Sequence, residues 1–207
     1  MTDPQIDLWA YENATYSDAV TCICGVDEAG RGPLAGPVYA AAVILPQGLI
    51  IEGLNDSKKL TEKRREALYD EIIEKAVAYG IGCADEKEID EINILQATFQ
   101  AMCRAIAALS VRPDLALIDG NRDTDFGVPS KTIVKGDSLS ANIAAASILA
   151  KVTRDRLMKE YAEKYPQYGF EVHKGYGTKR HYEALREHGP CEIHRMTFLR
   201  KFYGEGK

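Results

Sequence analysis

The chain has 207 residues, of which 45% are hydrophobic and 28% are charged, and these values are ordinary for a soluble globular protein. The length suits one domain with at most a small appendage. The longest apolar runs are too short to span a membrane, and because the N-terminus is acidic and polar we expect no secretory signal. An odd number of scattered cysteines favours free thiols in a reducing compartment, so we expect a cytoplasmic protein. These cysteines are Cys22, Cys24, Cys83, Cys103 and Cys191.

The net charge of −5 is unevenly distributed along the chain. Residues 151–207 carry thirteen Lys and Arg against eight Asp and Glu, a balance of +5, whereas the remainder carries a balance of −10. A basic C-terminal quarter beside an acidic body is compatible with phosphate contact on one face, although solvated helices often carry such runs as well.

Apolar periodicity and turn residues predict nine elements after an N-terminal arm or helix at residues 1–20. In chain order, we expect a strand at 22–26, a strand at 38–45, a helix at 63–78 with Thr61 as its N-cap, a strand at 79–84, an amphipathic helix at 95–109, strands at 115–118 and 132–134, a long helix from 141 to 165, and a helix at 179–188. This order predicts an α/β fold with a mixed sheet covered by helices.

The most informative segment is CGVDEAGRGPLAGPV, residues 24–38. A short apolar strand runs into two adjacent carboxylates, Asp27 and Glu28, and the glycine-flanked cation Gly30-Arg31-Gly32 follows at once. Acids at a strand end can hold a hard divalent cation, and backbone without side chains lets a polyanion approach closely. The alternative is a strand that ends in an ordinary surface turn.

Two further aspartates follow predicted strands at Asp119 and Asp137. If the strand that ends at Asp119 lies parallel to the first strand, Asp27 and Asp119 end at the same edge of the sheet. Asp137 precedes the long helix, whose dipole favours a carboxylate. The convergence of these acids is a hypothesis about topology.

Converging carboxylates suit two-metal phosphoryl transfer, because Mg²⁺ prefers oxygen ligands and shares them with substrate phosphates. The rival chemistry uses two carboxylates as acid and base on a glycoside. The Gly-Arg-Gly segment, the Ser57-Lys58-Lys59 triplet and the basic tail fit a phosphodiester better. Nucleotide-triphosphate and dinucleotide motifs are missing from the sequence.

The residues also carry a family resemblance. The segments CGVDEAGRGPLAGPV, LNDSKKLT, NILQAT, LALIDGN, IVKGDSLSANIAAASILAKVTRD and HKGYGT, in this order, resemble bacterial ribonuclease HII from about Cys22 to Phe198. The resemblance implies a ribonuclease H-like fold with a five-stranded mixed sheet and a small C-terminal extension of helix and loop. It also implies Mg²⁺- or Mn²⁺-dependent cleavage of RNA in RNA–DNA hybrids, and on the 5′ side of ribonucleotides embedded in duplex DNA, leaving 3′-hydroxyl and 5′-phosphate ends.

The resemblance assigns roles to particular residues. Asp27, Glu28, Asp119 and Asp137 match the family's catalytic, metal-binding acids, with Asp27 as the bridging ligand. Gly30-Arg31-Gly32 matches the loop that reads the ribose 2′-hydroxyl, the group that separates RNA from DNA. Tyr176 matches the tyrosine that packs on the following deoxyribose; without the resemblance it would be a half-buried packing residue.

Phosphate contacts are expected from two further groups. Ser57, Lys58 and Lys59 precede a helix, where they either serve an anion together or form a solvated helix entry. Lys151 and Arg154 either face the duplex or pair with Asp155 or Glu160 on the surface. At two further positions, Leu139 and Met196, the family often carries a cation, so these substitutions bear on phosphate binding. The histidines of the tail lack a helical metal-binding pair, so no zinc site is expected.

The domain organisation implied by the resemblance is one globular unit. It comprises the arm at 1–20, a catalytic domain at 21–165 and a substrate-contacting extension at 166–207. Two rivals stay open: a ribonuclease HIII-like hybrid nuclease, and a non-catalytic hybrid-binding protein. We expect a monomer without membrane contact, and the aromatic residues Phe198, Phe202 and Tyr203 suggest a replication clamp as a further partner.

Overall fold

The computed structural model describes residues 7–55 and 57–204, apart from the side chain of Lys59. Its centre is a five-stranded sheet in the order β3-β2-β1-β4-β5. The strands are β1 (Ile23–Ala29), β2 (Val38–Ile44), β3 (Ala78–Ala84), β4 (Leu115–Asp119) and β5 (Ser130–Ile133). All five predicted strands are present, with bounds shifted by one to three residues.

The pairing of the strands determines where the acids lie. β1 pairs antiparallel with β2, which pairs antiparallel with β3, whereas β1, β4 and β5 run parallel. In the parallel pair Val26 lies opposite Ile118, so Asp27 and Asp119 are the next residues on neighbouring strands. The parallel arrangement on which the convergence hypothesis depended is confirmed, as is the mixed five-stranded sheet.

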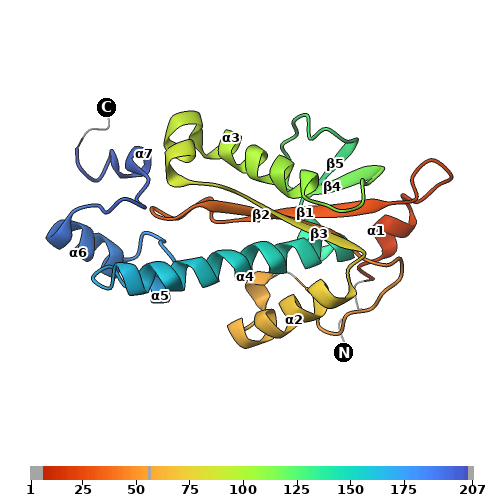
Figure 1. Cartoon of the computed structure of the whole chain (residues 1–207), viewed down its shortest axis with the longest axis horizontal. Helices are drawn as coiled ribbons and strands as arrows, with labels where there is room; N and C mark the ends of the chain where they lie inside the picture. Colours follow the sequence, from red (N-terminus) through yellow and green to blue (C-terminus); the bar gives the residue numbers. More distant parts are fainter. Residues whose placement is uncertain (1–6, 56, 205–207) are drawn as a thin grey trace.

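Helices cover both faces of the sheet (Figure 1). α3 (Glu86–Ala107) packs on one face, where its apolar residues join those of the strands in one core cluster. α4 (Ala141–Lys164) covers the other face together with α2 (Glu62–Lys75), and these form a second cluster. The N-cap predicted for α2 is confirmed, because the Thr61 hydroxyl accepts a hydrogen bond from the Arg64 amide.

A kink at Asn93 interrupts α3, which begins nine residues earlier than the apolar periodicity predicts. The capping box of Asp85 and Glu88 starts the first segment. At Asn93 the backbone takes φ 68°, and the Asn93 side chain accepts hydrogen bonds from the amides of Leu95 and Gln96. The predicted helix from Leu95 is therefore the second segment, and the first was missed because it carries fewer apolar residues.

The C-terminal part lies at the far end of α4 (Figure 1). It contains α6 (Lys179–His188), as predicted, and two short helices that periodicity could not reveal, α5 (Phe170–His173) and α7 (Met196–Leu199). These elements share a third apolar cluster around Tyr168 and Phe170 with the end of α4. The proposed division at residue 166 stays a prediction.

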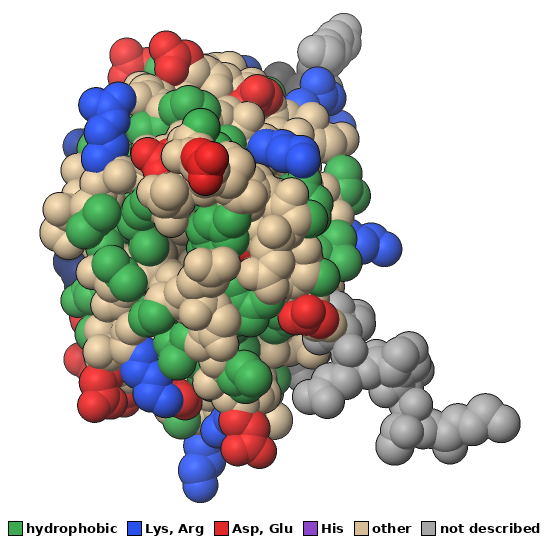
Figure 2. Space-filling view, turned by 90° about the vertical axis from the view of Figure 1, so that its right-hand side faces the viewer, with side chains coloured by type: hydrophobic (Ala, Val, Ile, Leu, Met, Phe, Trp, Pro, Cys, Tyr) green, Lys and Arg blue, Asp and Glu red, His purple; other side chains and the backbone are tan. Residues whose placement is uncertain are grey.

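Among residues 7–55 and 57–204, no helix has the length and apolarity that a membrane span requires. Figure 2 views the end of the molecule on the right of Figure 1, where α1 (Ala10–Asn13) and the turns after β2 lie. Acidic and basic side chains are scattered over this face among apolar ones and do not gather into a patch of one sign.

Candidate active site

Three aspartates from separate parts of the chain meet at one edge of the sheet. Asp27 lies in β1, Asp119 ends β4, and Asp137 lies in the 3₁₀ turn η2 (Gly136–Ser138) before α4. One carboxylate oxygen from each lies within 4.8 Å of those of the other two. The predicted convergence is confirmed, whereas the role of these residues stays a prediction.

Hydrogen bonds to the backbone hold these carboxylates in place. The Glu28 amide donates to Asp27 Oδ1 at 2.7 Å, and the Gly136 amide donates to Asp119 Oδ1 at 2.7 Å. The second bond joins the end of β4 to the turn that carries Asp137. The position of Asp137 relative to Asp119 is therefore set by the backbone.

Crowding of negative charge makes the site electrostatically unfavourable without a cation. Burial, and then the charges of Glu28 and Asp119, raise the pKa of Asp27 well above its ordinary value. Burial also raises the pKa of Glu28, although the neighbouring Arg31 opposes this shift. Hard oxygen ligands with surplus negative charge fit a divalent cation, which would stabilise the ionised forms.

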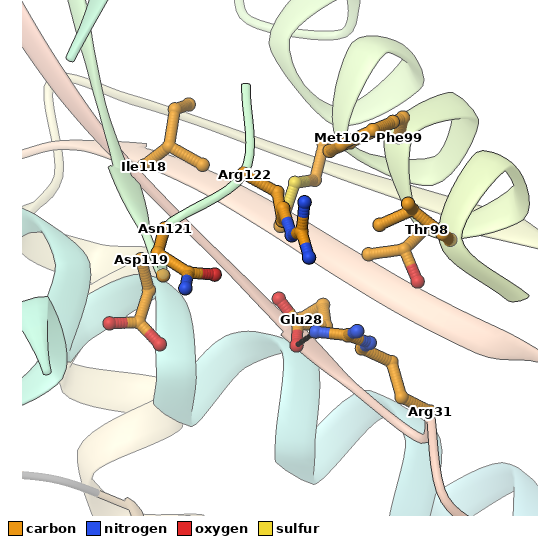
Figure 3. A pocket seen from close by; sticks show the side chains of 11 residues that line it. Glu28, Arg31, Thr98, Phe99, Met102, Ile118, Asp119, Asn121 and Arg122 are labelled. Atoms are coloured by element: carbon orange, nitrogen blue, oxygen red, sulfur yellow. Dashed lines mark hydrogen bonds and ion pairs between the residues drawn. The ribbon is translucent and has the colours of Figure 1, made fainter. Parts of the chain in front are cut away.

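Glu28 faces a small pocket whose lining includes Asp119 (Figure 3). Successive residues of a strand point to opposite faces, so Glu28 points away from Asp27. Its Oε1 lies 3.4 Å from Nη1 of Arg31. The pocket holds about 40 Å³, too little for a nucleotide, so a nucleic acid would lie across the surface. Its lining is Glu28, Arg31, Leu95, Thr98, Phe99, Met102, Ile118, Asp119, Gly120, Asn121 and Arg122.

Three polar residues of this pocket were missed at the level of sequence: Thr98, Asn121 and Arg122. Figure 3 shows Arg122 and Arg31 reaching into the pocket from different segments, on either side of Glu28. Asn121 and Arg122 follow Asp119 within three residues. Their position directly after the strand that ends at the candidate acid Asp119 could have identified them as site residues from the sequence.

The Ser57-Lys58-Lys59 triplet forms the 3₁₀ turn η1 (Ser57–Lys59) next to the aspartates. Lys58 Nζ lies 3.8 Å from Asp137 Oδ2, and the Lys58 side chain is largely exposed. The Ser57 hydroxyl is buried and accepts a hydrogen bond of 2.7 Å from Ser147 Oγ. The prediction for the side chain of Lys59 lies outside the described part of the structure.

The Gly-Arg-Gly segment rests on a buried guanidinium that the sequence did not indicate. Arg195 is fully buried, and it donates to the carbonyl oxygens of Gly30 (2.6 Å), Arg31 (3.0 Å) and Gly36 (2.6 and 2.9 Å). Burial lowers the pKa of Arg195 to about 9, so this cation stays protonated at neutral pH. Because the carbonyl groups turn inward to Arg195, the shape of the segment is fixed from beneath.

Arg154 is a second buried guanidinium, and its predicted contact with the duplex is wrong. Only 1% of it is exposed, and its three nitrogens donate to the carbonyl oxygens of Ala35 (3.0 Å), Pro37 (3.0 Å) and Lys174 (2.9 Å). It thereby joins the segment after β1 to the segment that carries Tyr176.

Lys151 forms the alternative contact foreseen in the sequence. Its Nζ lies 2.8 Å from Asp155 Oδ1, one helical turn further along α4. Arg65 approaches the same carboxylate, with 3.9 Å between Nη2 and Oδ2. The Lys151 ammonium is thus engaged within the protein, and its contact with a phosphate has no support in the structure.

The two glycines that flank Arg31 have different surroundings. Gly30 takes φ +101°, and a Cβ at this position would lie 2.1 Å from Arg154 Nε. The buried Arg154 side chain therefore leaves no room for any residue other than glycine here. At Gly32 a Cβ would meet only the Tyr176 ring, at 3.5 Å. Tyr176 is itself 45% exposed. Gly32 and Tyr176 therefore adjoin one another at the surface, which suits contact with a ligand.

A chain of buried histidines ends on the backbone of Tyr176. The Cys191 amide donates to His194 Nδ1 at 2.9 Å, which leaves the proton of neutral His194 on Nε2. This nitrogen lies 3.0 Å from His181 Nε2, and His181 Nδ1 lies 3.0 Å from the Tyr176 carbonyl oxygen. The pattern is satisfied when both rings are neutral. Their spacing in sequence gave no sign of this arrangement.

The neutral histidines make stability sensitive to acid. Burial is the main cause that lowers the pKa of both His181 and His194 to about 4, against about 6.5 in an unfolded chain. Between these values the unfolded chain binds more protons, so the free energy of unfolding should fall as pH drops from 6.5 to 4, by a few kcal/mol. Urea unfolding at a series of pH values measures this loss. His194→Gln should flatten the pH dependence, whereas the exposed His188→Gln should keep it; equal slopes in both variants would contradict the assignment.

The aromatic residues of the tail pack inward for the most part. Phe198 joins two core clusters, and Phe202 packs in the cluster around Tyr168. Phe198 and Phe202 are half-buried, whereas Tyr203 is 42% exposed. The rings of Phe198 and Phe202 are thus engaged within the chain, which disfavours them as a docking motif for a clamp. The two positions that depart from the family pattern, Leu139 and Met196, are both exposed.

Comparisons with known proteins agree with this fold. A family model described as ribonuclease HII matches residues 24–201. Ribonuclease HII of Acetivibrio thermocellus is 56% identical over 197 residues, which cover 95% of this chain and 77% of that protein. The crystal structure of ribonuclease H2 from Pyrococcus horikoshii matches with a TM-score of 0.74 and 29% identity, covering 89% of this chain and 97% of that one. The PCNA complex of ribonuclease HII from Archaeoglobus fulgidus matches with a TM-score of 0.71 and 27% identity, covering 85% and 94%.

The family model covers most of the sequence, including all four acids, the Gly-Arg-Gly segment and Tyr176. The high identity to the relative from Acetivibrio thermocellus extends over nearly the whole chain. The chain therefore belongs to the ribonuclease HII family and is an endoribonuclease that acts on RNA–DNA hybrids.

Proposed function

We propose that Asp27, Glu28, Asp119 and Asp137 hold two Mg²⁺ or Mn²⁺ ions for hydrolysis on the 5′ side of a ribonucleotide embedded in duplex DNA. The observation that carries this proposal is the approach of three carboxylates to within 4.8 Å at one edge of the sheet. When bound, such ions activate the attacking water and stabilise the leaving oxygen. Because the ligands are oxygens and the cluster is anionic, softer metals are disfavoured.

The chain's own residues would orient the scissile strand over these acids. Gly32 leaves room for a ribose at the surface, and Arg31 beside it supplies a cation for the adjacent backbone. Lys58 would meet the phosphate next to the reacting bond, and the support is its ammonium, which lies 3.8 Å from Asp137. These groups bind and position the substrate, and the acids hold the reacting centre.

Tyr176 is proposed to pack on the deoxyribose that follows the ribonucleotide. The support is its exposure of 45% and its place 3.5 Å from the position that a Gly32 side chain would take. A ribose that contacts Gly32 and a deoxyribose that packs on Tyr176 would be neighbouring sugars on either side of the RNA–DNA junction. This arrangement would recognise the junction itself.

A duplex with a single embedded ribonucleotide tests the function directly. The protein is incubated with this duplex and with a uniform RNA–DNA hybrid, in Mg²⁺, in Mn²⁺ and in chelator, and products are sized on a denaturing gel. We expect a nick on the 5′ side of the ribonucleotide with either metal and none in chelator. Cleavage confined to the uniform hybrid would favour a ribonuclease HIII-like specificity, and binding without cleavage would favour a hybrid-binding protein.

Tyr176→Ala should reduce the preference for the junction. An aromatic packing contact contributes about 1 kcal/mol, so cleavage of the single-ribonucleotide duplex should fall about fivefold to tenfold more than cleavage of the uniform hybrid. The measurement is kcat/KM on both substrates. Tyr79→Ala, on β3, is a matched control because Tyr79 has a similar exposure of 40%. An equal loss on both substrates would refute the junction role.

We further propose that the enzyme acts in the cytoplasm and as a monomer. All five cysteines are free thiols, which suits a reducing compartment. One copy of the chain supplies all three converging aspartates, so a second copy is not needed to complete the cluster.

A further inference from the structure

The N-terminal arm carries a carboxylate that is buried against the start of α4. Glu12, in α1, is 0% exposed, and among the described residues none donates a hydrogen bond to its Oε2. Its other oxygen, Oε1, accepts hydrogen bonds from Ser140 Oγ (2.6 Å), the Asn142 amide (3.2 Å) and Asn142 Nδ2 (3.2 Å). Burying a carboxylate costs folding free energy unless hydrogen bonds such as these compensate for the lost hydration.

These contacts complete the cap of a helix that adjoins the active site. The first four amides of an α-helix have no partner within the helix. In α4 the Ala141 amide donates to the Leu8 carbonyl oxygen and the Asn142 amide donates to Glu12. Of the other two, the Ile143 amide donates to Ser140 Oγ and the Ser140 amide donates to the Gly136 carbonyl oxygen. The arm thus satisfies half of these amides, and Glu12 lies where the helix dipole favours a negative charge.

The same residue is linked to the aspartate cluster by a short hydrogen-bonded path. Ser140, held by Glu12, donates its amide to the Gly136 carbonyl oxygen at 2.8 Å, closing the turn that contains Asp137. The Gly136 amide in turn donates to Asp119 Oδ1. Asn142 Oδ1 also accepts from the Leu45 amide at 2.8 Å, which ties the same corner to the end of β2.

We propose that Glu12 is a positioning residue for the metal site: by fixing Ser140 and the first turn of α4, it holds Asp137 in register with Asp27 and Asp119. The arm is therefore part of the catalytic architecture and not a peripheral appendage. Asp137 precedes α4, as the sequence suggested, and the Asn142 amide of the same helix donates to Glu12. This inference rests on the proposed metal site.

Binding of Mn²⁺ alone, followed by electron paramagnetic resonance without substrate, tests the role of Glu12 apart from activity. In Glu12→Ala the dissociation constant for Mn²⁺ should rise about tenfold, the effect expected when a group that orients a metal ligand is lost. Glu12→Gln should restore most of the affinity, because its amide oxygen can accept from Ser140 and Asn142. Glu12→Asp, whose oxygen is withdrawn by one methylene, replaces Glu12→Ala if that variant fails to fold.

Trp9→Phe separates positioning from general stability. It removes the hydrogen bond of 2.8 Å from Trp9 Nε1 to the Leu49 carbonyl oxygen, a contact of the same arm that does not involve α4. We expect a lower melting temperature with unchanged Mn²⁺ affinity. Wild-type affinity in Glu12→Ala, or an equal loss in Trp9→Phe, would overturn the role of Glu12. Absence of Mn²⁺ binding by the unaltered protein would instead overturn the metal site itself.

Discussion

Asp27→Asn is expected to abolish cleavage while raising the melting temperature of the metal-free protein. Asp27 is one of the three converging aspartates, and loss of a charge that would hold the proposed metal ions should cost at least about 4 kcal/mol of transition-state stabilisation, or about a thousandfold in rate. Its ionised form is disfavoured by burial and by Glu28 and Asp119, so a neutral amide relieves repulsion in the folded state. The amide oxygen can still accept from the Glu28 amide.

The two effects of Asp27→Asn are measured separately. Cleavage of a single-ribonucleotide duplex is followed with excess Mg²⁺, and thermal unfolding is followed in chelator, where the melting temperature should rise. Duplex binding should be largely retained. Asp70→Asn is the control, because the Asp70 side chain is 80% exposed on α2 and lies 3.9 Å from the surface cation Arg156. Near-normal turnover by Asp27→Asn would show that Asp27 does not bridge metal ions.

Arg195→Ala should be the most destabilising single substitution near the site. It leaves buried carbonyl groups of Gly30, Arg31 and Gly36 without their donor, and each such loss costs about 1–3 kcal/mol. A total of about 4 kcal/mol corresponds to a fall in melting temperature of about 10 °C for a chain of this size. Arg195→Lys should behave similarly, because an ammonium cannot reach three carbonyl groups in the geometry of a guanidinium.

The functional consequence of Arg195→Ala is measured well below its melting temperature. With the Gly-Arg-Gly segment no longer held from beneath, kcat/KM for the single-ribonucleotide duplex should fall by about tenfold or more, as when a supporting group is removed. Arg112→Lys is the matched control, since Arg112 also donates to a backbone carbonyl but is exposed and makes one such bond, to Gly127 at 3.2 Å. A folded Arg195→Ala variant with wild-type kcat/KM would contradict the supporting role.

Much of the fold could be predicted because its signals are local. The buried runs that became β1, β2 and β4, and the periodicity from Leu95, are short-range patterns that depend on nearby residues alone. The meeting of Asp27 with Asp119 followed from one assumption, that a helix between the strands permits a parallel pair. The first segment of α3 was missed because its start depends on a capping box and its apolar face is sparse.

The residues that support the site could not be predicted, because their roles depend on distant partners. The sequence pattern suggested that Arg154 is a surface cation on a helix. Its hydrogen-bond partners Ala35 and Pro37 are more than a hundred residues away in the sequence. Arg195 reaches back to Gly30 across a similar distance in sequence. Nothing in the residue type separates an arginine that binds a phosphate from one that binds buried carbonyl groups.

Arg154 has one more consequence, because it ties the two segments that we propose to contact the sugars to a single side chain. Its guanidinium holds Ala35 and Pro37 on one side and Lys174 on the other, and the Leu34 amide also donates to the Gly175 carbonyl oxygen. The gap between Gly32 and Tyr176 is then preset before any substrate arrives. Little conformational entropy is lost on binding, and a sugar sequence of the wrong kind cannot be accommodated by loop adjustment. The protein would then discriminate between sugars because the spacing of Gly32 and Tyr176 is the same before and after the substrate binds.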